Sequence, residues 1–165
     1  MMVERPFLCM PAFPLAELVL LRHGIAEPRI GGQDHPDRGL SSEGRDRTEA
    51  VVVALVQRGL QLDLLVSSPF RRALETAQIA LKAGLAPLLD INPHLSPGDD
   101  AGSLVKGLSG RVGLVGHEPD LGDLACLLTG LPAGALKLKK AGLVQLRQSS
   151  GQWQLRALLT PGLLL

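Results

Sequence analysis

The amino-acid sequence predicts an α/β fold: a mostly parallel central sheet with helices on both faces, arranged as a three-layer sandwich. Short apolar runs of strand length alternate with longer segments of helical periodicity, and Gly, Pro and Ser residues separate them. The chain has 165 residues, of which 45% are hydrophobic, and this is enough for one domain with a substantial core. We therefore expect a single domain over residues 1–165.

The first strand and the first helix have clear sequence signals. Residues 18–22 form a short, continuous apolar run, as expected for a strand that is buried on both faces. A loop rich in Gly and Pro follows. Residues 42–58 then carry a single apolar stripe, with Ser41 and Ser42 as candidate N-caps and Gly59 as the terminator. This segment predicts an amphipathic helix that packs on the sheet.

A second strand and helix follow in the same order. Residues 62–67 predict the strand, and the next helix is expected to begin with a capping hydroxyl from Ser68 and with Pro69 at its first position. Its apolar face extends to Gly84. Residues 86–91 predict a third strand, so the alternation of strand and helix continues.

The last third of the chain completes the sheet. Residues 111–116 predict a fourth strand, and a helix opens at residue 119 and extends to about residue 128. Residues 142–147 and 153–159 flank a turn of Ser and Gly, which is typical of an antiparallel hairpin. We expect this hairpin to close the sheet at one edge.

The beginning of the chain and its composition restrict the class of protein. Residues 1–16 contain prolines and charges but no continuous apolar stretch, so we expect an N-terminal extension rather than a secretory signal. The formal net charge of +1 gives no electrostatic reason to expect nucleic acid or a membrane as the partner, and no stretch is long enough to span a bilayer. Two cysteines are too few for a disulfide scaffold. We expect a cytoplasmic protein in which the group of Lys137, Lys139 and Lys140 is a solvated face.

Histidines and arginines follow three of the expected strands. Arg22 and His23 come at the end of the first strand, and Arg72 lies in the first turn of the helix after the second strand. His117 precedes a proline that opens a helix after the fourth strand. The carboxyl ends of parallel strands form the ligand-binding edge of such sheets, and guanidinium groups near helix N-termini attract oxyanions. A histidine beside a fixed positive charge is suited to attack on phosphorus, although each histidine taken alone could be a buried core residue.

Four blocks of the sequence together resemble the histidine phosphatase superfamily, named for its Arg-His-Gly motif, and within it the small SixA-like phosphohistidine phosphatase branch. The matching blocks are Leu21-Arg22-His23-Gly24, Arg38-Gly39-Leu40-Ser41 followed by Glu43-Gly44, Ser67 to Ala73 with Thr76-Ala77, and Val115-Gly116-His117-Glu118-Pro119. They cover residues 18–130. The resemblance implies a phosphoglycerate mutase-like fold and phosphatase activity.

The resemblance also implies a role for each matching residue. His23 would be the nucleophile that becomes a phosphohistidine, which water then hydrolyses to release inorganic phosphate. An acceptor near Gly24, itself expected at the substrate site, would hold one imidazole nitrogen of His23. Arg22 and Arg72 would hold the phosphoryl oxygens, and His117 would donate to the same group as a protonated second histidine. This mechanism requires no cofactor and no metal.

Several assignments stay open at this point. Arg38 could contact the phosphate or the phosphorylated partner, or it could pair with Asp34 or Asp37. Asp34 could be an acid, a base that orients water, or a solvated loop carboxylate. His94 stands where larger relatives of the family have a glutamate acid. Either His94 is the acid, or no strong acid is required because the leaving imidazole of a phosphoramidate is a good leaving group; we favour the second alternative.

The expected substrate follows from what the chain lacks between its third and fourth strands. Larger relatives insert a helical lid there, whereas residues 93–110 are few and rich in Gly, Asp and Ser. An open site suits a phosphohistidine displayed on a protein partner, such as a phosphorelay histidine domain. A small-molecule phosphomonoesterase, acting on a sugar or nucleotide phosphate, is the second hypothesis. A non-catalytic phosphate-binding or docking module is the third.

Overall fold

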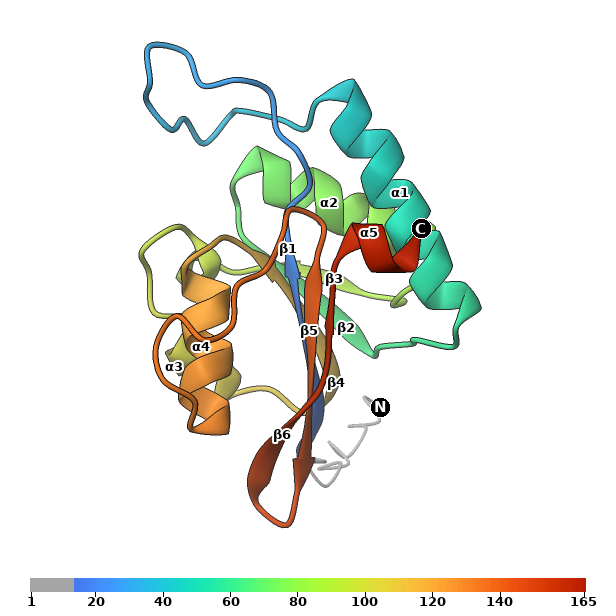
Figure 1. Ribbon diagram of the computed structural model, residues 1–165, viewed down its shortest axis with the longest axis vertical. Helices are drawn as coiled ribbons and strands as arrows, with labels where there is room; N and C mark the ends of the chain where they lie inside the picture. Colours follow the sequence, from blue (N-terminus) through green and yellow to red (C-terminus); the bar gives the residue numbers. More distant parts are fainter. Residues whose placement is uncertain (1–13) are drawn as a thin grey trace, which may run out of the picture.

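The computed structural model describes residues 14–165 and shows a six-stranded sheet between two layers of helices (Figure 1). The strands are β1 (Leu15–Arg22), β2 (Leu64–Ser67), β3 (Leu89–Ile91), β4 (Gly110–Gly116), β5 (Leu143–Ser149) and β6 (Gln152–Leu159). Their order across the sheet is β3-β2-β4-β1-β5-β6: the first four strands are parallel, β5 is antiparallel to β1, and β6 is antiparallel to β5. The predicted fold class and the closing hairpin are confirmed.

The helices divide between the two faces of the sheet. They are α1 (Ser42–Gln57), α2 (Arg71–Lys82), α3 (Ala101–Val105), α4 (Asp120–Thr129) and α5 (Pro161–Leu164), with a 3-10 helix at Pro93–Leu95. Successive side chains of a strand point to opposite faces. Leu18 and Leu20 of β1 therefore pack with the α3 and α4 side, whereas Val19 and Leu21 pack with α1, α2 and α5.

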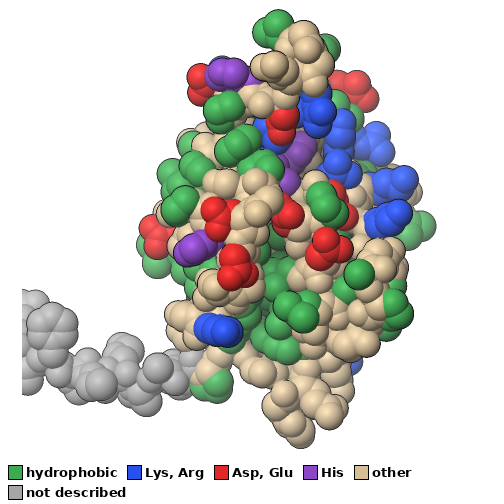
Figure 2. Space-filling view, turned by 90° about the vertical axis from the view of Figure 1, so that its left-hand side faces the viewer, with side chains coloured by type: hydrophobic (Ala, Val, Ile, Leu, Met, Phe, Trp, Pro, Cys, Tyr) green, Lys and Arg blue, Asp and Glu red, His purple; other side chains and the backbone are tan. Residues whose placement is uncertain are grey.

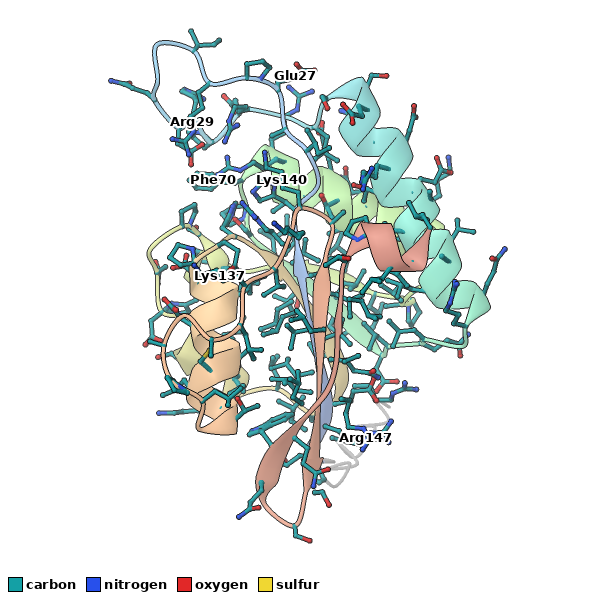
Figure 3. All side chains as sticks on the ribbon, viewed as in Figure 1. Glu27, Arg29, Phe70, Lys137, Lys140 and Arg147 are labelled. Carbon is teal, nitrogen blue, oxygen red and sulfur yellow. The ribbon has the colours of Figure 1, made fainter. Side chains whose placement is uncertain are left out.

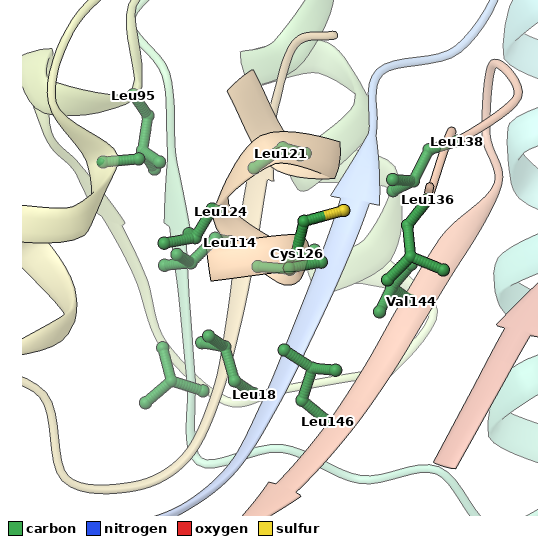
Figure 4. Close-up of a cluster of buried hydrophobic side chains, with 14 of the residues drawn as sticks. Leu18, Leu95, Leu114, Leu121, Leu124, Cys126, Leu136, Leu138, Val144 and Leu146 are labelled. Atoms are coloured by element: carbon green, nitrogen blue, oxygen red, sulfur yellow. The ribbon is translucent and has the colours of Figure 1, made fainter. Parts of the chain in front are cut away.

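The core on each face consists almost entirely of aliphatic side chains. Figure 4 shows the face covered by α4, where Leu121, Leu124 and Cys126 meet Leu114 and Leu146 of the sheet. Cys126 is buried and carries a free thiol. In a chain with few aromatics, this interlocking of Leu, Val and Ala side chains supplies the hydrophobic stabilisation.

Several predicted boundaries are wrong. Leu15 and Ala16 belong to β1 rather than to an N-terminal extension, and residues 1–13 lie outside the described part of the chain. Helix α2 begins at Arg71 rather than at Pro69, and Phe70 is its N-cap; the hydroxyl of Ser68 accepts from the Phe70 amide and lies against His117. Helices α3 and α5 were not expected. Between residues 14 and 165, no helix is both long and apolar enough to cross a bilayer.

Strand order and register bring three strand ends to one place. β4 lies between β1 and β2, with Arg22 opposite Gly116 and Ser67 opposite Val115. The hydrogen bonding continues one residue further, where the His23 amide donates to the Gly116 carbonyl over 3.0 Å. The residues that follow the three strands therefore share one edge of the sheet.

Candidate active site

A hollow of about 200 Å³ lies at the carboxyl ends of β1, β2 and β4. Its lining is predominantly basic: Arg22, His23, Arg29, Asp34, Arg38, Arg72, Pro97, His117, Glu118 and Lys140. The structure thus brings together the two arginines and two histidines that the sequence places after separate strands. In Figure 2, histidine side chains are visible inside a hollow near the upper end of the molecule, and Lys and Arg side chains gather beside them.

His23 is buried and held in a single orientation. Its Nδ1 lies 2.7 Å from the carbonyl oxygen of Gly24. A carbonyl only accepts, so Nδ1 carries the proton and Nε2 keeps its lone pair. Burial lowers the pKa of His23 to about 3; the Gly24 hydrogen bond opposes this shift, and the charges of His117, Arg72 and Arg22 add to it. At neutral pH the imidazole is an uncharged nucleophile.

Gly24 acts on the site through its backbone. Its carbonyl fixes His23, and its amide donates to Thr76 Oγ1 of α2 over 3.0 Å. A Cβ at this position would overlap the hydroxyl of Thr48 on α1. Gly24 does not line the hollow itself; it lies behind His23, where its carbonyl is the acceptor expected near this glycine. Its small size lets the chain after β1 pack between two helices.

Arg72 is the second residue of α2, and its guanidinium lies at the centre of the site. Its Nε donates to His23 Nε2 over 3.3 Å, and its NH2 donates to Asp34 Oδ2 over 2.8 Å. The third nitrogen, NH1, is buried and has no partner among the described residues. The neighbouring Arg71 points outward and pairs with Glu75, as expected for a surface residue.

Arg22 and His117 each also have one buried side-chain nitrogen with no hydrogen-bond partner within the described chain. Arg22 NH1 donates to the Leu138 carbonyl over 2.9 Å, whereas Arg22 Nε is unpaired. His117 Nε2 lies 2.8 Å from Ser68 Oγ, whereas His117 Nδ1 is unpaired. Together with Arg72 NH1, these atoms are the donor set that an oxyanion requires.

His117 is neutral in the unliganded protein, whereas the sequence led us to expect a protonated histidine that donates to the bound phosphoryl group. Burial, reinforced by the charge of Arg72, lowers the pKa of His117 to about 4. The Ser68 hydroxyl accepts from the Phe70 amide and can donate its own proton to His117 Nε2. A neutral His117 with its proton on Nδ1 is then still a hydrogen-bond donor. Sequence reasoning assigned Ser68 to helix capping and missed this contact.

Asp34 and Arg38 belong to the site. Asp34 Oδ1 accepts from Arg38 over 3.0 Å, and Arg38 lines the hollow as well, so its pairing with Asp34 does not remove it from the site. Burial alone would raise the pKa of Asp34, but the hydrogen bond from Arg38 and the charges of Arg72 and Arg38 outweigh it and lower the pKa. Asp34 is therefore ionised at neutral pH and cannot supply a proton in the unliganded protein.

His94 is not in the lining of the hollow. Its side chain is half exposed, and its Nδ1 lies 3.0 Å from Asp99 Oδ1. From the whole segment 93–110, only Pro97 lines the site. The arrangement does not support His94 as the acid.

Besides Pro97, three residues of the lining were not predicted as site residues: Arg29, Glu118 and Lys140. Lys140, expected on a solvated face, lines the hollow, and burial together with the charges of Arg22, Arg38 and Arg29 lowers its pKa. Glu118 accepts from the amides of Gly122 and Leu138 and so ties α4 to the segment before β5. Arg29 is a single basic residue in a loop and Lys140 belongs to a short group of lysines, and neither lies in a motif that points to the site. No group of three His, Cys, Asp or Glu side chains within residues 14–165 is arranged to hold a metal ion.

Comparison with known proteins gives a consistent result. The family model of the histidine phosphatase superfamily (branch 1) matches residues 18–95. An uncharacterized protein of Picosynechococcus sp. is 36% identical over 146 residues, which are 84% of this chain and 88% of the relative.

Solved structures resemble the whole fold. One from Agrobacterium tumefaciens, provisionally named phosphohistidine phosphatase SixA, is 26% identical with a TM-score of 0.76, covering 91% of this chain and 100% of the other. The protein histidine phosphatase SixA in complex with tungstate is 20% identical with a TM-score of 0.77, covering 88% and 97%. A mycobacterial glucosyl-3-phosphoglycerate phosphatase is 24% identical with a TM-score of 0.67, covering 86% and 97%.

The fold, the oxyanion site and these comparisons define a phosphatase of the α/β class. The chain belongs to the histidine phosphatase superfamily, and SixA proteins are among its structural relatives.

Proposed function

We propose that this protein removes the phosphoryl group from a phosphohistidine of a protein partner through a covalent intermediate on His23. One observation carries the proposal. The uncharged Nε2 of His23 lies in a hollow of about 200 Å³ together with the unpaired nitrogens of Arg22, Arg72 and His117. This arrangement suits one phosphoryl group, held by its oxygens beside a nucleophile.

The first step transfers the phosphoryl group to the enzyme. His23 Nε2 attacks phosphorus as the bond from phosphorus to the partner's imidazole nitrogen breaks, and that electron pair stays on the departing imidazole. Arg22 and Arg72 stabilise the negative charge on the three phosphoryl oxygens. Neutral His117 donates to the same oxygens through Nδ1. Arg72 Nε must release His23 Nε2 and turn to the phosphoryl group during this step.

The second step regenerates the free enzyme. Water attacks the phosphohistidine, the electron pair of the broken bond returns to His23 Nε2, and inorganic phosphate leaves. Asp34 is ionised and lies in the lining of the hollow, so it can accept the proton of the attacking water; Arg72 and Arg38 fix its position and also weaken it as a base. The first step needs no carboxylic acid, because an imidazole that is already protonated on its other nitrogen leaves as a neutral group.

The size and openness of the site favour a protein substrate. Pockets that enclose small-molecule ligands usually have volumes of about 300–1,000 Å³, so a hollow of about 200 Å³ leaves the leaving group outside. Segment 93–110 contributes only Pro97 to the site and forms no lid.

A second hollow favours the alternative function, a small-molecule phosphomonoesterase. It measures about 310 Å³ and shares Arg22 and Glu118 with the site, so a sugar or nucleotide could occupy it while its phosphate reached His23. The fold shared with glucosyl-3-phosphoglycerate phosphatase is consistent with such chemistry.

Trapping of the phosphoenzyme tests the nucleophile. We expect the wild-type protein to become labelled by a radiolabelled phosphohistidine protein under rapid acid-free quenching, and His23→Ala to give no label. His94→Ala is the matched control, because it removes a histidine outside the site, and it should label normally. Labelling that persists in His23→Ala would show that the mechanism is wrong.

Turnover of different donors tests the substrate class. The value of kcat/KM for a phosphohistidine protein should exceed the values for sugar phosphates and nucleoside monophosphates. If a small ester is the better substrate, the alternative function is the correct one.

A further inference from the structure

The lining of the hollow carries more positive charge than one phosphoryl group can neutralise. Five permanent cations line it, namely Arg22, Arg29, Arg38, Arg72 and Lys140, against the two carboxylates of Asp34 and Glu118. A phosphoryl group brings at most two negative charges. The site therefore retains positive charge after a phosphoryl group has bound.

The cations fall into a paired inner group and an unpaired outer pair. Arg72 and Arg38 both bind Asp34, and Arg22 binds the Leu138 carbonyl. Arg29 and Lys140 are exposed, and neither forms an ion pair or a side-chain hydrogen bond within residues 14–165. Figure 3 shows Arg29 on the loop after β1 and Lys140 on the segment before β5, at the same end of the molecule.

The inner group is sufficient to hold the phosphoryl oxygens. The unpaired buried nitrogens belong to Arg22, Arg72, His117 and Arg38, and none belongs to the outer pair. Partial burial lowers the pKa of the Lys140 ammonium group, and the charges of Arg22, Arg38 and Arg29 add to this shift, so the field at Lys140 is positive. A second anion bound near Lys140 would reduce the repulsion between this ammonium group and the neighbouring guanidinium groups.

We propose that Arg29 and Lys140 form a second anion subsite that binds an acidic side chain next to the phosphohistidine of the partner protein. The inference rests on the proposed function and specifies its substrate. A carboxylate fits better than a second phosphoryl group, because each of the two cations carries one charge and both are solvated. Such a contact at the rim acts mainly through encounter and binding, so it should change KM rather than kcat.

Two synthetic phosphohistidine peptides test the subsite. They are identical except that the residues flanking the phosphohistidine are Glu in one and Gln in the other. We expect kcat/KM of the wild-type protein to be roughly three- to tenfold higher for the Glu peptide, because exposed ion pairs support a difference of this size. The difference should arise from a lower KM. This preference should shrink as salt is added, because exposed charges are screened.

Substitutions then assign the preference to the two residues. The ratio between the peptides should fall partway in Arg29→Gln and in Lys140→Gln, and to about one in the double variant. Lys106→Gln removes the same charge from an exposed lysine at the end of α3 and should keep the wild-type ratio. Equal use of the two peptides by the wild-type protein, or a preference that survives in the double variant, would overturn the subsite alone. Hydrolysis of neither peptide would instead contradict the proposed function, and the subsite with it.

Discussion

Phosphoryl transfer at a histidine requires that one ring nitrogen be unprotonated and free, and in this chain a backbone carbonyl meets that requirement. The Gly24 carbonyl accepts from His23 Nδ1, which leaves the lone pair on Nε2. The same glycine packs against Thr48 and donates to Thr76, so the carbonyl is fixed by two helices. The Arg-His-Gly triplet therefore has a physical reason at each position: charge, nucleophile and close packing.

The two adjacent arginines of α2 should differ strongly in function. The Arg72 side chain is 3% exposed and contacts His23, whereas the Arg71 side chain is 58% exposed and pairs with Glu75. We expect Arg72→Ala to lower kcat by about 10²–10³-fold, the usual effect of losing a donor to a developing oxyanion. Arg71→Ala should change kcat by less than about threefold. Steady-state kinetics on one phosphohistidine protein will measure both, and a larger effect of Arg71→Ala would contradict the site.

Ser68 is predicted to be a positioning residue for His117. Its hydroxyl accepts from the Phe70 amide, so its proton is available to His117 Nε2, which keeps the imidazole proton on Nδ1 toward the substrate. We expect Ser68→Ala to lower kcat on the order of tenfold, which corresponds to about 1.4 kcal/mol, with a smaller change in KM.

The neighbouring serine provides the control for this prediction. Ser67 is equally buried, but its hydroxyl donates to the Ser68 carbonyl and contacts no histidine. Ser67→Ala should therefore keep kcat near the wild-type value. Nitrogen chemical shifts of His117 give a second readout, since a purely structural serine would not change the proton's place on the ring. Equal loss of kcat in both variants would contradict the role of Ser68.

At the scale of the elements, Glu75 connects α2 to the loop after β1. It accepts from the Leu40 amide over 2.7 Å, and it pairs with both Arg45 of α1 and Arg71. Burial alone would raise the pKa of Glu75, but these hydrogen bonds outweigh it and lower the pKa. This carboxylate fixes the end of the loop that carries Asp34 and Arg38.

We expect Glu75→Ala to reduce the free energy of unfolding by about 1.5–3 kcal/mol, the loss typical of charged hydrogen bonds. Because the loop loses its anchor, kcat/KM should also fall. Urea unfolding measures the first effect and kinetics the second. Glu49→Ala, at an exposed position of α1, is the control and should alter neither. Unchanged stability in Glu75→Ala would show that the loop is held by other contacts.

The sequence predicted long elements well and short ones poorly. The apolar run of β1 and the stripe of α1, capped by Ser41, appear as expected. The five-residue α3 escaped prediction because one turn of helix in a Gly- and Asp-rich stretch has no measurable periodicity. Ser68 shows a different limit. A Ser-Pro pair is a good helix start, but tertiary contact with His117 redirected its hydroxyl.

The site residues also divide into those that the sequence could place and those that it could not. Arg22, His23, Arg72 and His117 could be placed from the sequence because each directly follows a strand and belongs to a recognisable motif. Arg29 and Lys140 could not, since loop geometry brings them to the hollow. His94, the alternative acid that we did not favour, lies outside the hollow; sequence position after β3 does not say which way a short helix turns its side chains.

At the scale of the whole molecule, strand order makes the site. β1, β4 and β2 are neighbours although they are far apart in sequence, and all three are parallel. Their carboxyl ends therefore meet at one edge, the usual ligand-binding edge of such sheets. Periodicity predicts the strands but not their order. From the sequence, the meeting of the residues after β1, β2 and β4 at one edge could therefore be inferred only from the family resemblance.

Burial of two neutral histidines in this edge makes the folded molecule sensitive to acid. The pKa values of His23 and His117 are lowered to about 3 and about 4, against about 6.5 in an unfolded chain. The unfolded state therefore binds more protons as pH falls below about 6.5, and the native state is destabilised. We expect each histidine to remove on the order of 1 kcal/mol of unfolding free energy between pH 7 and pH 5.5.

Urea unfolding of His23→Gln and His117→Gln at the two pH values measures this contribution. Each variant should lose less stability between pH 7 and pH 5.5 than the wild-type protein does, by on the order of 1 kcal/mol, because the group that titrates on unfolding is gone. The buffers must be free of phosphate, since a ligand of the native state would add its own stabilisation. His94→Gln, at an exposed histidine, should keep the wild-type pH dependence. An unchanged slope in His23→Gln and His117→Gln would mean that these imidazoles are not held neutral by burial.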